Sequence, residues 1–259
     1  MLIAIDIGNS SINIGFFTDK GLLVQKIETH PIKTPERYTS ILRDFLSDPE
    51  MGSGSAEKNT LGVIISSVVT GHTEVLAEAC KGLMPENLLI LSPEIKTGLV
   101  FDIARPEELG SDRIANAVAA YELYRRPVAV VDFGTATTIS VLGKDANYIG
   151  GAIMPGVRLM NEALAKGTSK LSEVNLVPPT SALGTDTSKC IQSGLFYGIA
   201  GAVERLLQEI EKEVDFPLKV IITGGYGGMV SRFLRREHTL KPNLTLEGLK
   251  IIYMRNKDA

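Results

Sequence analysis

The chain has 259 residues, of which 44% are hydrophobic and 22% are charged. This length suits one large domain or two compact ones, and the ordinary composition excludes a disordered or low-complexity chain. The formal net charge is −3 and basic residues cluster only in short pairs, which argues against nucleic acid and membranes as partners.

Metal sites and targeting segments are equally poorly supported. The two cysteines and three histidines match no metal-binding spacing. The apolar start, residues 1–5, meets Asp6 and is too short for a signal peptide. No apolar run approaches the roughly 20 residues that a membrane-spanning helix needs. We therefore expect a cytoplasmic protein.

Hydrophobic periodicity predicts strands and helices that alternate along the chain, which is typical of the α/β class. Proline at residue 35 marks the start of one helix, and glycine-containing turns separate several strands. In chain order, the predicted elements are strand 2–6, strand 13–17, helix 35–47, loop 47–60, strand 61–69, helix 74–83, strand 88–91, helix 111–124, strand 127–132, strand 139–142, helix 159–164, helix 191–214 and strand 219–223.

An internal repeat is the most informative pattern in the sequence. Residues 3–10 (IAIDIGNS) align with residues 129–136 (AVVDFGTA), almost half a chain later. In both segments an apolar strand ends in aspartate, glycine follows two positions on, and small polar residues lead into a second strand. Such a repeat predicts two similar α/β halves, residues 1–125 and 126–259, with a nucleotide cleft between them.

The chemistry of the two repeated turns favours phosphate binding. Glycine and hydroxyl residues expose backbone N–H groups and small donors that suit phosphate oxygens. The aspartate before each turn, Asp6 or Asp132, can hold Mg²⁺ directly or through water. A third glycine cluster at 223–228 follows a predicted strand and allows the backbone to approach a ligand closely.

Two other nucleotide-binding classes are excluded. The chain has no G-x-x-x-x-G-K-[ST] segment, so it is not a P-loop protein. Residues 132–134 imitate the DFG of protein kinases, but the other protein-kinase motifs are absent.

Five motifs together resemble a known family. They are DIGNS at 6–10, GSDRIANA at 110–117, VDFGTATT at 131–138, GGAIMPG at 150–156 and TGG at 223–225. In this order they resemble type III pantothenate kinases, which belong to the actin/hexokinase/Hsp70 ATPase superfamily. The resemblance implies two duplicated RNase H-like halves and ATP-dependent phosphorylation of pantothenate, the first step of coenzyme A synthesis. It also implies a homodimer, Mg²⁺ and a monovalent cation such as K⁺ or NH₄⁺.

Matching positions carry the roles that the resemblance implies. The implied ATP-binding residues are Asp6, Ile7, Gly8, Asn9, Ser10, Ser11, Ile12, Asn13 and Thr135. The implied pantothenate-binding residues are Gly110, Ser111, Asp112, Arg113 and Thr187. Asp132 is expected to bind the monovalent cation, and Asp6 to bind Mg²⁺. Asp112 is the expected catalytic base, and its place in the first turn of a predicted helix favours an ionised carboxylate.

Two positions depart from the family pattern. Ile103 stands where the family usually has a tyrosine that contacts pantothenate, which predicts a less polar substrate pocket. Thr70 stands where the family's Ser-Val-Val-Pro has proline. Two other functions stay open: a nucleotide-binding regulatory protein, such as a transcriptional accessory factor without kinase activity, and a kinase for another small hydroxyl substrate.

Overall fold

The computed structural model describes residues 1–47, 62–83, 87–92 and 94–257. By its contacts the chain forms two compact units. Unit 1 contains Met1–Gly98, Arg105–Ala119 and Thr245–Ala259, and unit 2 contains Leu99–Ala104 and Ala120–Leu244. The division into residues 1–125 and 126–259 stays a prediction. Almost all of the predicted loop 47–60 lies outside the described residues.

Unit 1 is built on a mixed sheet with the strand order β3-β2-β1-β4-β5. Its strands are β1 (Leu2–Ile7), β2 (Ser11–Thr18), β3 (Gly21–Glu28), β4 (Gly62–Ser67) and β5 (Leu88–Ile90). β1 pairs antiparallel with β2 and parallel with β4, so β1 and β4 end at the same edge. This register sets Asp6 opposite Asn13 on one side and opposite Ser66 on the other.

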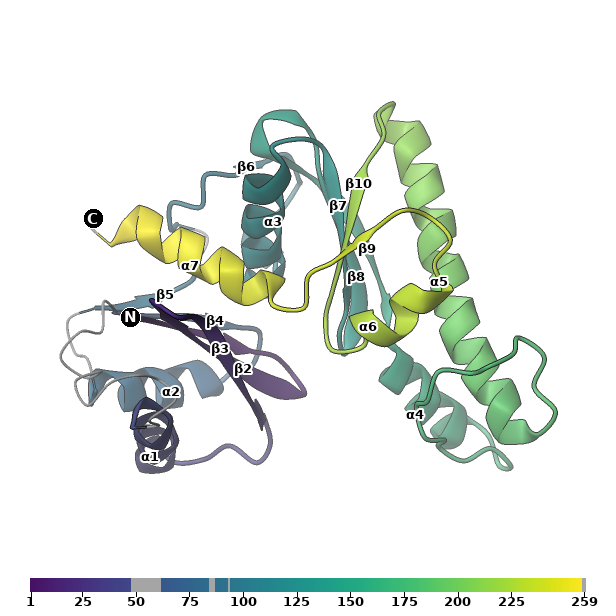
Figure 1. The fold of residues 1–259 in the computed structure, drawn as a ribbon, viewed down its shortest axis with the longest axis horizontal. Helices are drawn as coiled ribbons and strands as arrows, with labels where there is room; N and C mark the ends of the chain where they lie inside the picture. Colours follow the sequence, from purple (N-terminus) through teal and green to yellow (C-terminus); the bar gives the residue numbers. More distant parts are fainter. Residues whose placement is uncertain (48–61, 84–86, 93, 258–259) are drawn as a thin grey trace. The chain divides into compact units, whose positions relative to one another are not determined.

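Helices cover both faces of this sheet. α1 (Pro35–Leu46) and α2 (His72–Lys81) lie on one face and α7 (Leu244–Asn256) on the other (Figure 1). α1 begins where it does because Pro35 suits a first helical turn and the Thr34 hydroxyl accepts the N–H of Arg37 at 3.3 Å. The core against α1 and α2 is aliphatic and aromatic, and it includes Ile3, Ile5, Ile7, Ile12, Ile14, Phe16, Tyr38, Leu42 and Leu76.

Unit 2 repeats the same sheet with one strand added. The strand order is β11-β10-β7-β8-β9-β6. The strands are β6 (Val100–Phe101), β7 (Val128–Phe133), β8 (Ala136–Leu142), β9 (Asn147–Pro155), β10 (Lys219–Thr223) and β11 (Thr239–Leu240). The order β9-β8-β7-β10-β11 repeats β3-β2-β1-β4-β5, with antiparallel and parallel pairings in the same places. The α/β duplication predicted from the internal repeat is therefore confirmed.

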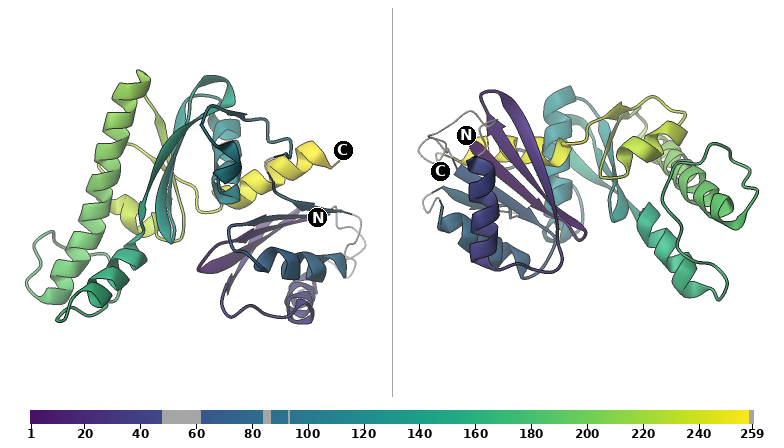
Figure 2. Two further views of the ribbon diagram at one scale, coloured as in Figure 1. Left: turned by 180° about the vertical axis from the view of Figure 1, so that it is seen from behind. Right: turned by 60° about the horizontal axis from the view of Figure 1, so that its bottom comes forward.

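One long helix dominates the packing of unit 2. The remaining helices are α3 (Ser111–Tyr124), which begins in unit 1, and α4 (Val157–Gly167), α5 (Thr187–Val214) and α6 (Gly227–Val230). Short 3₁₀ turns occupy Pro106–Glu108, Lys144–Ala146 and Ser231–Phe233. α5 runs along the sheet (Figure 2) and buries apolar side chains that recur every three or four residues. They are Ile191, Leu195, Phe196, Ile199, Val203 and Leu207.

The structure also contains elements that the periodicity did not predict. β3 lies at the edge of its sheet with mostly exposed or partly buried side chains, so its apolar pattern is weak. β9 contains Gly150 and Gly151, which interrupt the apolar pattern of its sequence but not the strand. α5 begins at Thr187 rather than at residue 191, because Asp186 caps it by accepting the N–H of Lys189 at 2.9 Å. Among the described residues, no helix has the length and apolar character that crossing a membrane requires.

Candidate active site

The first repeated turn joins β1 to β2 and leaves its polar groups accessible. Ile7 pairs with Ile12, and the N–H of Gly8 donates to the carbonyl of Ser11 at 3.0 Å across the turn. Asn9 and Ser10 are exposed, whereas Ile7 and Ile12 are fully buried in the core. Of the residues predicted to bind ATP here, these two isoleucines can therefore reach a ligand only through their backbone.

A threonine that was not predicted from the sequence stabilises this turn through hydrogen bonds to its backbone. Thr29 follows β3 and is fully buried. Its hydroxyl donates to the carbonyl of Gly8 at 2.6 Å, and its N–H donates to the carbonyl of Ser10 at 3.4 Å. Two backbone acceptors of the turn are thus fixed by one residue, 21 positions beyond Gly8 in the sequence.

Serine side chains connect Asp6 to the start of α3. Ser66 is fully buried in β4, and its hydroxyl donates to the Asp6 carboxylate at 3.2 Å. The Ser66 and Ser111 hydroxyl oxygens lie 2.9 Å apart, and the N–H of Ser67 donates to the Ser111 hydroxyl at 3.0 Å. The structure therefore brings together Asp6 and Ser111, two residues that the sequence predicted for different ligands.

Asp112 follows directly in the first turn of α3 and is partly buried. One carboxylate oxygen accepts the N–H of Arg113 at 2.7 Å. Burial raises the pKa of the Asp112 carboxyl above its usual value, while the N–H and the charge of Arg113 lower it less. The net direction is thus opposite to the one that the helix N-terminus alone predicts. A raised pKa makes this carboxylate a better proton acceptor.

The second repeated turn joins β7 to β8 and is one residue shorter. Phe133 pairs with Thr137, and the N–H of Gly134 donates to the carbonyl of Ala136 at 3.0 Å. The N–H of Gly156 donates to the carbonyl of Thr135 at 3.1 Å. A side chain at position 156 would overlap the carbonyl oxygens of Gly134 and Thr135, so glycine is required for this contact.

The third glycine cluster lies against the second turn. Gly224 has φ of +89°, and a Cβ there would lie only 2.6 Å from the carbonyl carbon of Phe133 and would also overlap the Asp132 carboxylate. The N–H of Tyr226 donates to the carbonyl of Phe133 at 3.0 Å. Asp132, Thr135 and the glycine loop therefore form one polar site within unit 2.

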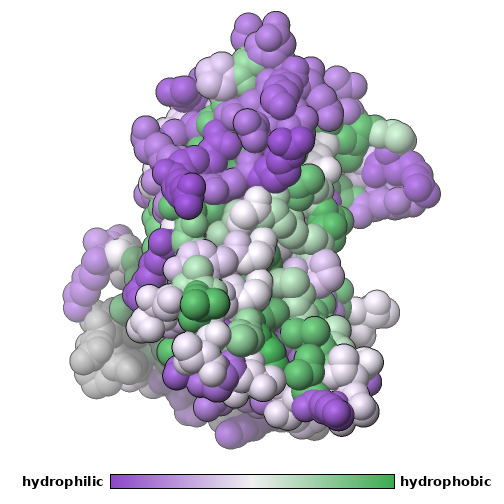
Figure 3. Space-filling view, turned by 90° about the vertical axis from the view of Figure 1, so that its right-hand side faces the viewer, coloured by the Kyte–Doolittle hydropathy of each residue, from purple (hydrophilic) through white to green (hydrophobic). Residues whose placement is uncertain are grey.

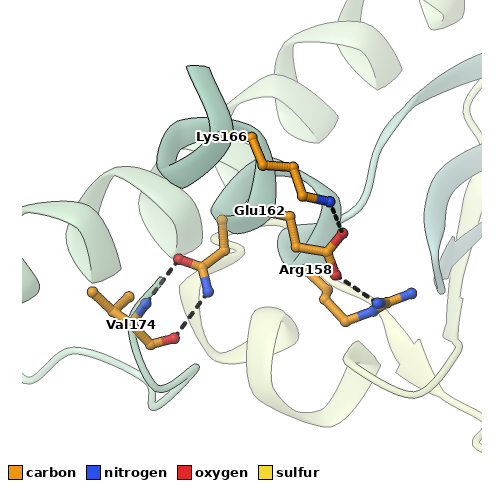
Figure 4. A network of polar contacts seen from close by, with 5 residues as sticks. Arg158, Glu162, Lys166 and Val174 are labelled. Atoms are coloured by element: carbon orange, nitrogen blue, oxygen red, sulfur yellow. Dashed lines mark hydrogen bonds and ion pairs between the residues drawn. The ribbon is translucent and has the colours of Figure 1, made fainter. Parts of the chain in front are cut away.

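Thr187 occupies the exposed first turn of α5. The segment before it is held in place by α4, where Asn161 donates to the carbonyl of Val174 at 2.9 Å and accepts its N–H at 3.1 Å (Figure 4). On the same helix, Glu162 pairs with Arg158 at 2.6 Å and with Lys166 at 3.8 Å. The contacts of Asn161 tie the chain at Val174 to α4, whereas the ion pairs of Glu162 lie within α4 itself.

The residues present fit a metal that arrives with a phosphate ligand. Within the described parts of the chain, no group of three or more His, Cys, Asp or Glu side chains could hold an ion. Mg²⁺ usually binds one or two carboxylates together with substrate phosphates and waters. A single carboxylate beside each polar turn, Asp6 in unit 1 and Asp132 in unit 2, matches that manner of binding.

Comparison with known proteins decides the family. A family model described as type III pantothenate kinase matches residues 2–209. The chain is 38% identical over 257 residues to the type III pantothenate kinase of Moorella thermoacetica, which covers 99% of this chain and 100% of that protein. The chain belongs to the type III pantothenate kinase family. The family that the five sequence motifs predicted is thus confirmed.

Solved structures of other proteins have the same fold as this chain. A structure described as a Baf family transcriptional activator from Campylobacter jejuni aligns with a TM-score of 0.62 and 22% identity, covering 99% of this chain and 100% of that one. A ROK family glucokinase from Streptomyces griseus, in complex with glucose and AMPPNP, aligns with a TM-score of 0.54 and 13% identity, covering 98% of this chain and 99% of that one. At these identities the likeness shows the fold alone.

Proposed function

We propose that this chain phosphorylates pantothenate with ATP, giving 4'-phosphopantothenate and ADP in the first step of coenzyme A synthesis. The observation that carries the proposal is the family match, which extends over nearly the whole chain at 38% identity. The two polar turns and the partly buried Asp112 supply the phosphate-binding and proton-accepting groups that such a reaction needs.

ATP is bound through its phosphates by small donors. In unit 1 the binding residues are Asp6, Ile7, Gly8, Asn9, Ser10, Ser11, Ile12 and Asn13, with the two isoleucines contributing backbone groups only. In unit 2 the Thr135 hydroxyl and N–H serve the same purpose. This assignment is supported by the accessible turn residues and by the contacts that hold each turn in place.

Pantothenate is bound at the start of α3, by Gly110, Ser111, Asp112 and Arg113, and by Thr187. Asp112 accepts the proton of the substrate hydroxyl as its oxygen attacks the γ-phosphorus and ADP leaves. The raised pKa of the Asp112 carboxyl supports this role, because a proton acceptor works best when its pKa approaches the working pH. Ile103 makes the pocket less polar than in relatives with tyrosine at this position.

Asp6 holds Mg²⁺ with the nucleotide, and Asp132 holds a monovalent cation such as K⁺ or NH₄⁺. When bound, these ions neutralise phosphate charge that develops during transfer. Each carboxylate stands beside its own polar turn, in its own unit, which supports two separate ion sites. The assignment of a different ion to each site follows the resemblance to the family.

The decisive experiment is a coupled assay for ADP release with and without pantothenate, followed by mass spectrometry of the product. We expect release that depends on pantothenate and a product one phosphoryl group heavier. ADP release with another small alcohol, but not with pantothenate, would indicate a different acceptor. Nucleotide binding without any acceptor-dependent release would favour the regulatory function, and the likeness in fold to the Campylobacter jejuni protein makes that outcome worth testing.

We also propose a homodimer formed through the outer face of α5. Figure 3 looks onto this side, where hydrophobic side chains gather below a hydrophilic region. Val177 and Leu183, in the segment before α5, are 56% and 79% exposed, and Tyr197 of α5 is 40% exposed. Gly198 of α5 has nothing within 4 Å of its Cβ position. A second copy with the same apolar face would cover them.

Light scattering during size-exclusion chromatography tests the homodimer. We expect twice the 27.9 kDa chain mass for the native protein and a single chain mass for Gly198→Glu, which improves helix propensity while adding a charge. Gln208→Glu, also on an exposed position of α5, is the control and should stay dimeric. A native protein of single-chain mass would refute the dimer.

A further inference from the structure

A row of hydroxyl groups connects the Asp6 carboxylate to the first residue of α3. Ser66 is the register partner of Asp6 and lies within hydrogen-bond distance of both Asp6 and Ser111, at 3.2 and 2.9 Å. Ser111 lies 3.0 Å from both the N–H and the carbonyl of Ser67. All of these groups belong to unit 1, so their spacing is fixed within one compact body.

The number of donors limits which hydrogen bonds Asp6, Ser66 and Ser111 can form at the same time. Each serine hydroxyl has one proton to donate, and an ionised carboxylate only accepts. Ser66 therefore donates to Asp6 when Asp6 is ionised, which leaves its lone pairs for Ser111. The single proton of Ser111 goes either to Ser66 or to the carbonyl of Ser67, while Ser111 accepts the N–H of Ser67. When Ser111 donates to Ser66, both hydroxyl protons point toward the carboxylate, and the hydrogen bond from Ser66 to Asp6 is strengthened by charge.

We propose that Ser66 and Ser111 are positioning residues that fix the Asp6 carboxylate relative to the start of α3, and hence relative to Asp112. The inference rests on the proposed function, in which Asp6 serves the nucleotide and Asp112 the acceptor hydroxyl. It gives Ser111 a role through Asp6, in addition to the substrate contact expected from the sequence. Because phosphoryl transfer depends on alignment of the reacting groups, loosening this row should lower turnover without removing any reacting group.

The test compares Ser66→Ala, Ser111→Ala and the double variant. Steady-state kinetics should show a loss of about 10-fold in kcat/KM for Mg-ATP in each single variant. This is near the lower end of the range for the charged hydrogen bond that Ser66 makes and near the upper end for the neutral one of Ser111. The double variant should lose no more than the worse single one, since the two hydroxyls act in series. Calorimetric titration should show a similar loss of affinity for Mg-ADP in all three variants. Ser111→Thr keeps a hydroxyl and should recover most of the Mg-ADP affinity that Ser111→Ala loses.

Thr39→Val is the matched control. The Thr39 hydroxyl donates to the carbonyls of Pro35 and Ala79 at 2.8 and 3.3 Å, within unit 1 but among its helices. This variant should melt at a lower temperature and keep native kinetics and Mg-ADP affinity. Serine variants that behave like Thr39→Val, or losses that add fully in the double variant, would overturn the positioning role.

Asp6→Asn and Asp112→Asn, measured alongside, separate this inference from the function on which it rests. If both aspartate variants keep native turnover, the proposed site itself is wrong. If they lose turnover while the serine variants do not, only the hydroxyl row is refuted. Should Ser66→Ala not fold, the pair Ser111→Ala and Ser111→Thr still decides, because the removed hydroxyl of Ser111 is only partly buried.

Discussion

The two repeated turns have the same place in their sheets but are held by different means. In unit 1, side-chain hydroxyls hold the turn: Thr29 bonds the carbonyl of Gly8 at 2.6 Å, and Ser66 bonds Asp6 at 3.2 Å. In unit 2, backbone groups hold the turn, and Gly156 and Gly224 approach it so closely that no side chain fits. Duplication has thus kept the hairpin and changed its support.

This difference predicts two kinds of sensitivity. A hydroxyl can be removed without moving the backbone, so changes around the first turn should act through lost hydrogen bonds of modest size. A contact between glycine and backbone cannot accept even a methyl group, so changes around the second turn should act through overlap and strain. The candidate base, Asp112, follows Ser111 in the chain and belongs to the same unit as the first turn.

Asp112→Asn should give the largest effect and would establish that the chemistry belongs to the unit of the first turn. General-base contributions are about 10²–10⁴-fold, so we expect turnover to fall by that factor while Mg-ATP still binds. The pH profile of the native enzyme should fall on its acid side at a pH above the usual aspartate pKa of about 3.9, because burial raises the pKa of Asp112. Unchanged turnover beside a lower melting temperature would reduce Asp112 to a structural residue.

The two turn carboxylates should respond to different cations. Asp6→Asn should lower activity at limiting Mg²⁺ by about 10- to 150-fold, as expected for the loss of a charged contact, and keep its response to K⁺. Asp132→Ala should show the reverse, with the K⁺ response lost at constant ionic strength. Initial rates over a grid of both cations measure this. Identical responses in the two variants would mean that the turns do not divide the cations between them.

Gly224→Ala tests the crowding of the second turn. A Cβ at φ of +89° is strained and would overlap the backbone of Phe133, so we expect a loss of about 1–3 kcal/mol in unfolding free energy together with weaker nucleotide binding. Urea unfolding and titration with Mg-ADP measure the two effects. Gly228→Ala, whose Cβ would meet only a leucine methyl at 3.9 Å, is the control and should be neutral or stabilising. Equal behaviour of the two variants would contradict the predicted overlap.

Thr29→Val should give the smallest effect and acts on the first turn alone. The variant keeps the size and the N–H of Thr29 but loses the hydroxyl that bonds Gly8. We expect the KM for Mg-ATP to rise about 2- to 12-fold, the range for one neutral hydrogen bond, with the KM for pantothenate unchanged. Thr29→Ser should restore the native value. A rise in both KM values would indicate a general disturbance of the unit instead.

Sequence patterns predicted those parts of the structure that depend on residues close together in the chain. The strand, aspartate and glycine of each repeat stand within a few residues of one another, so both hairpins and the duplicated sheet could be recognised. The long apolar stripe of α5 was equally clear, although its capped start at Asp186 was missed.

The remaining site residues depend on contacts between distant segments. Thr29 lies 21 residues from Gly8, and Ser66 lies 60 residues from Asp6. No local sequence pattern distinguishes these two buried residues from polar residues on the surface. The pKa direction at Asp112 was missed for a related reason, because burial is a property of the folded unit. α7 escaped prediction because apolar residues occupy much of its circumference, which hides the helical period.

α7 has a consequence for synthesis on the ribosome. It belongs to unit 1, where Thr245 donates to Asn116 at 2.8 Å and Asn256 donates to the carbonyl of Lys96 at 2.9 Å. At about 5–20 residues per second, α7 follows β4 by roughly 10 to 40 s. During that time one face of the nascent N-terminal sheet lacks its covering helix. The unit that is translated first is therefore the last to be completed. We expect chaperones to bind the face of its sheet that α7 later covers.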